Sequence, residues 1–239
     1  MFDDNLVIAF VPARGGSKGL PGKNLMSIGG RSMIERAVES AMVWPSGSKV
    51  DVCVVSSDDE DVLAAGKAAG AVTFERSEFA ASDAATAADV IRDYFESDDV
   101  LIDLDGRDPW IVYLQPTSPG RTGAHVEAAF GLLGAGELSG GARSVVSVTT
   151  PEKSPYWTLN IDAVGRLTPL FPEAFEANRQ SLQPAYIPNG AIYIFKLSDF
   201  LAGGSVPVQD AAAFIMSREE SVDIDTREDF ERAKAILEG

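Results

Sequence analysis

The chain has 239 residues, 45% of them hydrophobic, and carries 36 acidic against 20 basic side chains, a formal net charge of −16. A chain of this length suits one main α/β domain over residues 1–239. The negative charge repels polyanions, which argues against nucleic acid as the principal partner. No apolar run approaches the roughly 18 residues of a membrane span, and the N-terminal stretch lacks signal-peptide features, so we expect no membrane partner and a cytoplasmic protein.

Strand-like and helix-like segments alternate in the N-terminal half. Residues 5–11 (NLVIAFV) form an apolar run of strand length that ends in a glycine-rich loop. A helix is predicted next, with Ser32 and Glu35 as its capping box. The stretch VDVCVVSS then predicts a buried strand, and DDEDVLAAGKAAG a helix with Ser57 and Glu60 as a second capping box.

The same alternation continues toward the middle of the chain. AVTFER predicts a short strand, residues 84–95 a helix, and PWIVYLQ another apolar strand. Thr122 is the expected cap of a helix over residues 123–133, and SVVSVTT is the next strand. The single cysteine, Cys53, lies in an apolar run and is expected to be a buried structural thiol.

The alternation fails between about residues 150 and 188. Proline and short extended pieces take over, and the aromatic side chains there need burial somewhere, so we expect a subunit contact. NGAIYIFK then predicts a strand and SVDIDT a strand end, with Thr226 capping the last helix. The overall pattern predicts a mostly parallel sheet covered on both faces, with ligands at the carboxyl ends of its strands.

One of these strand ends carries an unusual loop, VPARGGSKGLPGKN, with Arg14, Lys18 and Lys23 among four glycines. Glycines let backbone N–H groups approach a phosphate closely, and the cations add charge-assisted contacts. The loop is not a Walker A motif, because Lys23 is followed by Asn24, and it contains no G-x-G-x-x-G. Polyphosphate binding is the favoured interpretation, and an ordinary surface loop is the alternative.

An acidic pair is the second candidate feature. Asp223 and Asp225 are two residues apart, so a strand would place both carboxylates on one side, where they could hold Mg²⁺. The alternative is a turn and helix-capping role beside the last helix. The only histidine, His125, lies inside a predicted helix, which argues against a Ser-His-Asp triad or a multi-histidine zinc site.

Several motifs in sequence resemble the acylneuraminate cytidylyltransferases: PARGGSKGLPGKN, SSDDED, LQPTSPGRT, SPYW, RQSLQPAYIPNGAIYI and SVDIDTREDF. The resemblance runs from about Val7 to Ile236. It implies a Rossmann-like nucleotidyltransferase fold, with a mostly parallel central sheet flanked by helices and an extended dimerisation arm at about 150–188. It also implies a homodimer that transfers CMP from CTP to an acidic nine-carbon 2-keto sugar and releases pyrophosphate.

The resemblance also implies roles for individual residues. The expected catalytic residues are Arg14, Lys23, Asp223 and Asp225. The expected nucleotide-binding residues are Ala13, Arg14, Gly15, Gly16, Ser17, Lys23, Asn24, Arg76, Thr86 and Gln115. The expected sugar-binding residues are Gln115, Arg179, Gln180, Tyr186, Asn189, Gly190, Tyr193 and Phe195. Asp223 and Asp225 match the magnesium-binding pair.

Three departures from the family pattern bear on the acceptor sugar. Ile187 stands where YRPNG has arginine, Gly120 where PTSPLRT has a larger apolar residue, and DAATA leaves Thr86 where DTASS has two serines. Legionaminic acid and related nine-carbon acids therefore stay open as acceptors. A cytidylyltransferase for the eight-carbon acid Kdo and a catalytically silent nucleotide-sugar-binding protein are the remaining alternatives.

Overall fold

A seven-stranded sheet forms the centre of the molecule, in the order β11-β7-β10-β6-β1-β4-β5. The computed structural model describes residues 6–17, 19–47, 50–98, 100, 102–134 and 142–239. The strands of this sheet are β1 (Val7–Pro12), β4 (Val52–Ser57), β5 (Val72–Glu75), β6 (Trp110–Tyr113), β7 (Ser144–Thr149), β10 (Ile187–Lys196) and β11 (Ala212–Ile215). The helices around it are α1 (Met33–Met42), α2 (Glu60–Ala68), α3 (Glu78–Ala81), α4 (Ala87–Phe95), α5 (Gly123–Gly131), α7 (Leu197–Gly203) and α8 (Arg227–Glu238).

Most neighbouring strands run parallel. β1 is parallel to β4 and β6, β4 to β5, and β11 to β7, whereas β10 is antiparallel to both β6 and β7. Parallel strands joined by helices are typical of doubly wound α/β folds. The prediction of a mostly parallel sheet flanked by helices is therefore confirmed.

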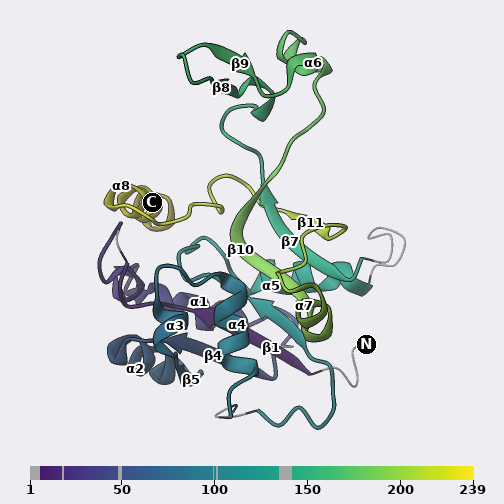
Figure 1. Ribbon diagram of the computed structural model, residues 1–239. Coiled ribbons are helices and arrows are strands. Elements are labelled where there is room, and N and C mark those ends of the chain that lie inside the picture. Colours follow the sequence, from purple (N-terminus) through teal and green to yellow (C-terminus); the bar gives the residue numbers. More distant parts are fainter. Residues whose placement is uncertain (1–5, 18, 48–49, 99, 101, 135–141) are drawn as a thin grey trace.

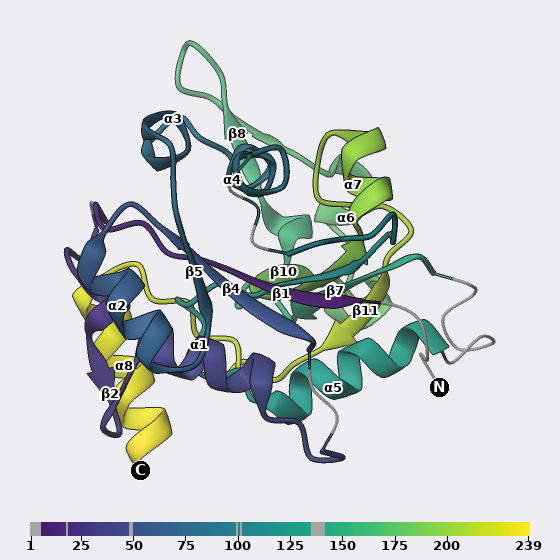
Figure 2. The same cartoon turned by 90° about the horizontal axis from the view of Figure 1, so that it is seen from below.

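Helices cover the sheet on both faces (Figure 2). Alternate residues of β1 serve the two layers: Ala9 packs in the cluster that contains α1 and α5, and Phe10 in the cluster that contains α4 and α7. A strand buried on both faces has no polar side, which explains why residues 7–11 are continuously apolar.

A smaller third core lies beside the main sheet. It joins the hairpin of β2 (Ser27–Ile28) and β3 (Arg31–Ser32) to the chain that enters α8. Its buried members are Leu20, Ile28, Met33, Val222, Ile224, Phe230 and Ala233. This core holds the glycine-rich loop against the segment that carries Asp223 and Asp225.

Between β7 and β10 the chain leaves the body of the molecule (Figure 1). We call residues 150–186 the arm. It contains the antiparallel strands β8 (Leu159–Ile161) and β9 (Leu167–Pro169), then α6 (Pro172–Phe175). Large apolar side chains stay exposed on it: Trp157, Leu159, Ile161, Val164, Leu167, Leu170, Phe171 and Tyr186. The position of the arm matches the predicted excursion, and its role in dimerisation stays a prediction.

Most predicted helix starts are confirmed. Ser32 and Glu35 form the capping box of α1, and Thr122 and Thr226 cap α5 and α8. The second predicted capping box is wrong, because Asp59 caps α2 through its side chain. Ser57 instead accepts a hydrogen bond from the backbone of Asp59 (3.0 Å) and shapes the turn before the helix.

The predicted helix over residues 84–95 begins later than expected. Thr86 and Asp89 form a capping box, so α4 starts at Ala87, and the short helix α3 precedes it. A threonine followed three residues later by aspartate satisfies the free N–H groups of a first turn, which fixes the start there.

The stretch SVDIDT was predicted as a strand end and is not a strand. Val222 and Ile224 alternate with aspartates because both apolar side chains enter the third core. The sheet edge is formed instead by β11, which the sequence pattern did not indicate, and α7 was also missed.

Cys53 is a buried free thiol, as predicted, and burial raises its pKa to about 12. Among the helices within the described ranges, none is both long enough and apolar enough to cross a membrane.

Candidate functional site

The carboxyl ends of β1, β4 and β6 meet at one edge of the sheet. The N–H of Ala13 donates to the carbonyl of Ser56 (2.9 Å), and that of Leu114 donates to the carbonyl of Phe10 (3.0 Å). Ligands of open parallel sheets bind at this edge. A pocket of about 400 Å³ lies here, within the roughly 300–1,000 Å³ typical of small-molecule sites.

The pocket walls come from five stretches that are distant in sequence: the loop after β1, the residue after β5, the start of α4, the end of β6 with the residues after it, and the segment before α8. Its lining residues are Pro12, Ala13, Arg14, Lys23, Asn24, Arg76, Ala85, Thr86, Ala87, Val90, Tyr113, Gln115, Pro116, Thr117, Asp223 and Asp225. The fold thus brings together most residues predicted for the nucleotide and both residues predicted for the metal.

Close backbone contacts fix the glycine-rich loop. A Cβ on Gly19 would lie 2.3 Å from the carbonyl oxygen of Asp225, so a side chain there would push the loop off the acidic segment. The buried side chain of Asn24 donates to the carbonyl of Arg14 (2.9 Å). These contacts explain the glycine and the asparagine in the motif without a ligand.

Other predicted loop residues lie beside the pocket. Gly15 has no room for a Cβ, which would lie 2.6 Å from the Asp59 carboxylate. Ser17 is buried and its N–H donates to the carbonyl of Gly15 (3.0 Å), whereas Gly16 is exposed. Lys18 lies outside the described residues. Gly15, Gly16 and Ser17 therefore do not line the pocket, and their contact with a nucleotide stays a prediction.

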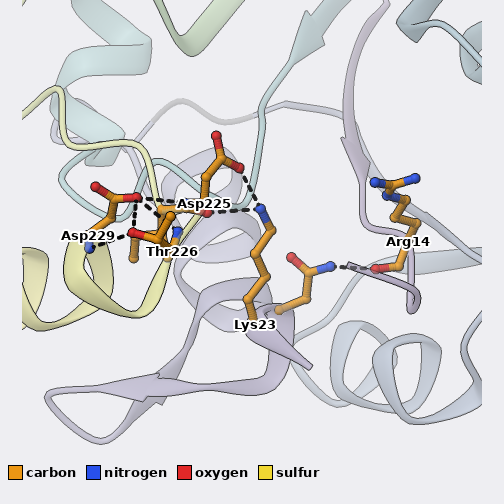
Figure 3. A network of polar contacts seen from close by, with 7 residues as sticks. Arg14, Lys23, Asp225, Thr226 and Asp229 are labelled. Atoms are coloured by element: carbon orange, nitrogen blue, oxygen red, sulfur yellow. Dashed lines mark hydrogen bonds and ion pairs between the residues drawn. The ribbon is translucent and has the colours of Figure 1, made fainter. Parts of the chain in front are cut away.

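Lys23 points from the loop toward the acidic segment (Figure 3). Its Nζ donates to the carbonyl of Ile224 and to Oδ1 of Asp225, both at 2.9 Å. Only 13% of the Lys23 side chain is exposed, against 73% of Asp225. The ammonium group is thus held in place at the pocket wall, and its carboxylate partner stays open to solvent.

Two further groups of the loop, the Arg14 guanidinium and the Gly15 N–H, also bind carboxylates. Nη1 of Arg14 pairs with Asp83 at 2.6 Å, and the N–H of Gly15 donates to Asp58 at 2.9 Å. A carboxylate on a guanidinium or a loop amide occupies a position that suits a phosphate oxygen. The protein's own aspartates thus occupy the anion-binding groups of the loop.

Asp223 and Asp225 both reach the pocket although their segment is not a strand. The Asp223 side chain stays accessible to solvent, yet the pocket wall removes enough water to raise its pKa, and nearby Asp225 acts in the same direction. Hydrogen bonding with Thr117 and the charge of Lys23 oppose this rise. Neither aspartate caps α8, since Thr226 does.

The acidic pair has the donor chemistry that Mg²⁺ takes, namely carboxylate oxygens with room left for water and substrate phosphates. In the described part of the chain, no group of three or more His, Cys, Asp or Glu side chains could hold a metal ion. The two carboxylates fit the oxygen ligands that a magnesium ion takes, and a magnesium ion at this pair stays a prediction.

Arg76 and Tyr113 form the inner wall. Arg76 is buried, and its guanidinium donates to Oγ of Ser56 (2.9 Å) and to the carbonyl of Ser56 (2.8 Å). Burial lowers the pKa of Arg76 and raises that of Tyr113 to about 12. The phenol is therefore neutral at pH 7 and serves as a wall and a hydrogen-bonding group.

Gln115 lies at the junction of the pocket and β10. Gly190 has a positive φ of 76°, and a Cβ there would lie 2.4 Å from Oε1 of Gln115. The glycine is thus required both by its backbone conformation and by the side chain that crosses it.

The predicted sugar-binding residues on β10 have different surroundings. Tyr193 is half-buried and packs edge-to-face on Tyr113 at 6.1 Å. Burial raises its pKa, and the charge of Asp223 raises it further. Asn189 is buried, where its amide bonds Ser147 (2.6 Å) and Ser221 (2.9 Å). This network gives Asn189 a structural role.

Phe195 requires a correction. Its ring is completely buried in the core, 5.8 Å from the ring of Phe200. A side chain with no exposed surface offers nothing for a sugar to contact, so its aromatic character is explained by packing. Arg179, Gln180 and Tyr186 lie in the arm or at its end, and of these Gln180 and Tyr186 do not line the pocket.

Two of the three departures from the family motifs, at Gly120 and Thr86, have local explanations, and the structure gives none for Ile187. A Cβ on Gly120 would lie 2.6 Å from the backbone oxygen of Glu220, so this chain has no room for a larger residue there. Thr86 lines the pocket, but its hydroxyl already bonds Asp89 (2.7 Å) as a helix cap. Ile187 is 45% exposed at the start of β10.

Sequence reasoning missed some of the lining, notably Tyr113, Thr117 and Val90. Thr117 lies within the LQPTSP motif, so the motif itself was the available signal. Tyr113 and Val90 belong to apolar patterns that indicate core, and no pattern distinguishes a core residue from one at a pocket wall.

Several known proteins similar to this chain are cytidylyltransferases or CMP-sugar synthases. The profile of the family described as Cytidylyltransferase matches residues 8–127. The chain is 31% identical over 223 residues to an N-acylneuraminate cytidylyltransferase of Streptococcus agalactiae, covering 93% of this chain and 51% of the relative. It therefore spans about half the length of this relative. A CMP-N,N'-diacetyllegionaminic acid synthase of Legionella pneumophila is 31% identical, with 97% of this chain and 96% of the relative covered.

Solved structures agree on the fold. The structure of a CMP:2-keto-3-deoxy-manno-octonic acid synthetase with CTP has a TM-score of 0.65 at 18% identity, covering 98% of this chain and 99% of the other. A 4-diphosphocytidyl-2C-methyl-D-erythritol synthase from Anaerococcus prevotii has a TM-score of 0.63 at 14% identity, covering 100% and 98%. With the family profile and the full-length relative, these findings show that the chain belongs to the acylneuraminate cytidylyltransferase family of nucleotidyltransferases.

Proposed function

We propose that this protein transfers CMP from CTP to the anomeric hydroxyl of an acidic nine-carbon 2-keto sugar and releases pyrophosphate. The observation that carries the proposal is the convergence of Arg14, Lys23, Asp223 and Asp225 on one pocket at the carboxyl edge of the sheet. Cations and carboxylates together suit a triphosphate with its metal ion. Relatives named for N-acylneuraminate and for diacetyllegionaminic acid support an acceptor of this class.

Binding of the triphosphate requires rearrangement of the loop. Asp83 must release Arg14, and Asp58 must release the N–H of Gly15, before phosphate oxygens can take their places. Lys23 is already held at the wall by Ile224 and Asp225, so little side-chain freedom is lost when it meets the nucleotide.

The reaction is a displacement at the α-phosphorus of CTP. The anomeric oxygen forms the new bond to phosphorus, the bond to the bridging oxygen breaks, and pyrophosphate leaves with that electron pair. The hydroxyl proton passes to water. Arg14 and Lys23 neutralise the charge that accumulates on the leaving group. Asp223 and Asp225 would hold Mg²⁺, which would supply further neutralisation of the triphosphate when bound.

The acceptor would lie on the β10 side of the pocket, where Gln115 and Tyr193 border the nucleotide region. We also propose that the arm forms a homodimer contact, because its exposed apolar side chains need cover. Arg179 and Gln180 would then reach a sugar site from the arm. A cytoplasmic location fits the family's use of CTP.

Pyrophosphate release tests the proposal directly. Purified protein with CTP and Mg²⁺ would be assayed with N-acetylneuraminic, legionaminic, pseudaminic and deaminated neuraminic acids, and with Kdo. We expect release with at least one nine-carbon acid and none when ATP, GTP or UTP replaces CTP. Release only with Kdo would overturn the acceptor class, and CTP binding without release in any mixture would indicate a silent binding protein.

A further inference from the structure

Arg121 is a buried cation that the reaction described above does not use. It follows the LQPTSP motif, is 4% exposed, and contacts three separate parts of the fold. Its Nε donates to Oγ of Ser40 on α1 (3.0 Å). Its Nη1 donates to the carbonyls of Gln115 (2.7 Å) and Ala191 (2.8 Å).

The burial of this side chain is unusual because its charge is not paired. Within the described residues Arg121 forms no ion pair, and main-chain carbonyls and one hydroxyl are its partners. Burial lowers its pKa to about 9, which still leaves the guanidinium charged at pH 7. An uncompensated buried charge is unfavourable for stability, so packing alone does not explain an arginine here.

The place where Arg121 acts is the end of the β6–β10 ladder. The last pair toward the pocket is Tyr193 with Tyr113, and continuing that register sets Ala191 opposite Gln115. Arg121 donates to the carbonyls of both. The guanidinium thus bridges the two strands by hydrogen bonds just beyond the last regular residue pair.

Gln115 depends on that spacing. Its Oε1 passes so close to Gly190 that a Cβ there would lie only 2.4 Å away. On the other side of β10, the register with β7 shifts between Pro188 and Tyr193. Regular pairing with β7 therefore does not fix the position of β10 around Gly190 and Ala191. A small change in separation between Gln115 and Ala191 would move the carboxamide along the pocket wall.

We propose that Arg121 is a positioning residue that acts through Gln115: it sets the carboxamide at the wall between the nucleotide region and β10. The inference rests on the proposed function for its kinetic consequence, because Gln115 lines the proposed active site. The geometric part, that Arg121 fixes Gln115, stands on the hydrogen bonds alone.

A double-mutant cycle tests the kinetic consequence. Arg121→Lys and Arg121→Met would be measured with and without Gln115→Ala, as kcat and KM for the acid and for CTP. We expect Arg121→Met to lower kcat/KM for the acid on the order of tenfold when Gln115 is present and less than twofold in Gln115→Ala, because coupled residues are not additive. Arg121→Lys should restore part of the loss. An equal loss in both backgrounds would show that Arg121 serves only the fold.

Arg36→Met is the matched control. Arg36 also donates from its guanidinium to a main-chain carbonyl, that of Ile28, away from the pocket. It should lower the melting temperature without coupling to Gln115. If Arg121→Met fails to fold, Arg121→Lys decides, because it keeps the buried charge and removes only the fixed geometry of the guanidinium donors. It should give a smaller loss of kcat/KM that disappears in Gln115→Ala. A loss of the same size with and without Gln115 would overturn the proposal.

A second readout separates this inference from the proposed function. If the wild-type protein transfers CMP to no acid, the function fails, and the positioning is then tested by NMR. The Gln115 side-chain amide signals, assigned by their loss in Gln115→Ala, should shift or broaden in Arg121→Lys and stay unchanged in Arg36→Lys. Unchanged Gln115 signals in Arg121→Lys would overturn the positioning role.

Discussion

The nucleotide pocket and the arm differ in how far the side chains of one chain find partners within that chain. In the pocket, the two described cations of the loop have partners: Lys23 pairs with Asp225, and Arg14 pairs with Asp83. In the arm, Ile161 is 71% and Leu167 is 61% exposed, although they face each other in the β8–β9 ladder. The charged groups of the pocket are thus paired within one chain, whereas the described apolar side chains of the arm stay exposed.

This difference separates the two substrates. Most residues expected to bind CTP come from the body and meet around one cavity, whereas two of the residues expected to bind the sugar, Arg179 and Gln180, belong to the arm. Nucleotide binding should therefore depend on local charge, and acceptor use on what the arm contacts. Changes in each region should have separable effects.

Lys23→Ala should have the largest effect, and it should impair the pocket while leaving the arm unchanged. Removing a buried ammonium group aimed at the triphosphate should lower kcat/KM on the order of a hundredfold or more. Steady-state pyrophosphate release measures this, and circular dichroism checks that the fold persists. Lys234→Ala, which removes an exposed lysine near Glu238, is the control and should change activity less than twofold. Equal activity in the two variants would contradict the assignment of Lys23.

A charged arm should have the next largest effect. Ile161→Asp combined with Leu167→Asp places two carboxylates on the apolar surface, so a dimer that buries this surface should dissociate. We expect a monomer by light scattering, about tenfold lower activity with the acid, and CTP affinity within twofold of wild type by calorimetry. Leu201→Asp on α7, an exposed leucine on the body, is the matched control. A wild-type monomer, or a variant that stays dimeric, would contradict the proposed contact.

The same two regions show how far the sequence can predict this structure. The loop motif, LQPTSP and the caps at Ser32, Thr122 and Thr226 are local signals, and each reached the expected place. Local signals succeed because strand ends and helix starts are set by nearby backbone requirements.

The capping residue of α2 and the start of α4 were missed within a few residues, whereas the larger failures involve partners distant in sequence. SVDIDT alternates like a strand because Val222 and Ile224 pack into the third core, and no pattern in the segment shows which element receives them. Phe195 was predicted as a site residue, yet its ring fills the core. Such outcomes depend on tertiary packing that a single sequence does not reveal.

Asp83→Asn should have the smallest effect, and it tests whether the ion pair in the pocket competes with CTP. Asp83 pairs with Arg14 where a phosphate oxygen would bind, so CTP must compete with it. The pair is largely exposed, with 38% and 52% of the side chains accessible, and exposed ion pairs contribute roughly 0.2–1 kcal/mol. Its removal should therefore tighten CTP binding by no more than about fivefold, and the gain should shrink at high salt because screening weakens the competing pair.

Calorimetry at two salt concentrations measures this, with Asp103→Asn as an exposed control. Weaker CTP binding in Asp83→Asn would show instead that Asp83 orients Arg14 for the nucleotide, so that the pair is part of the binding site and not its competitor.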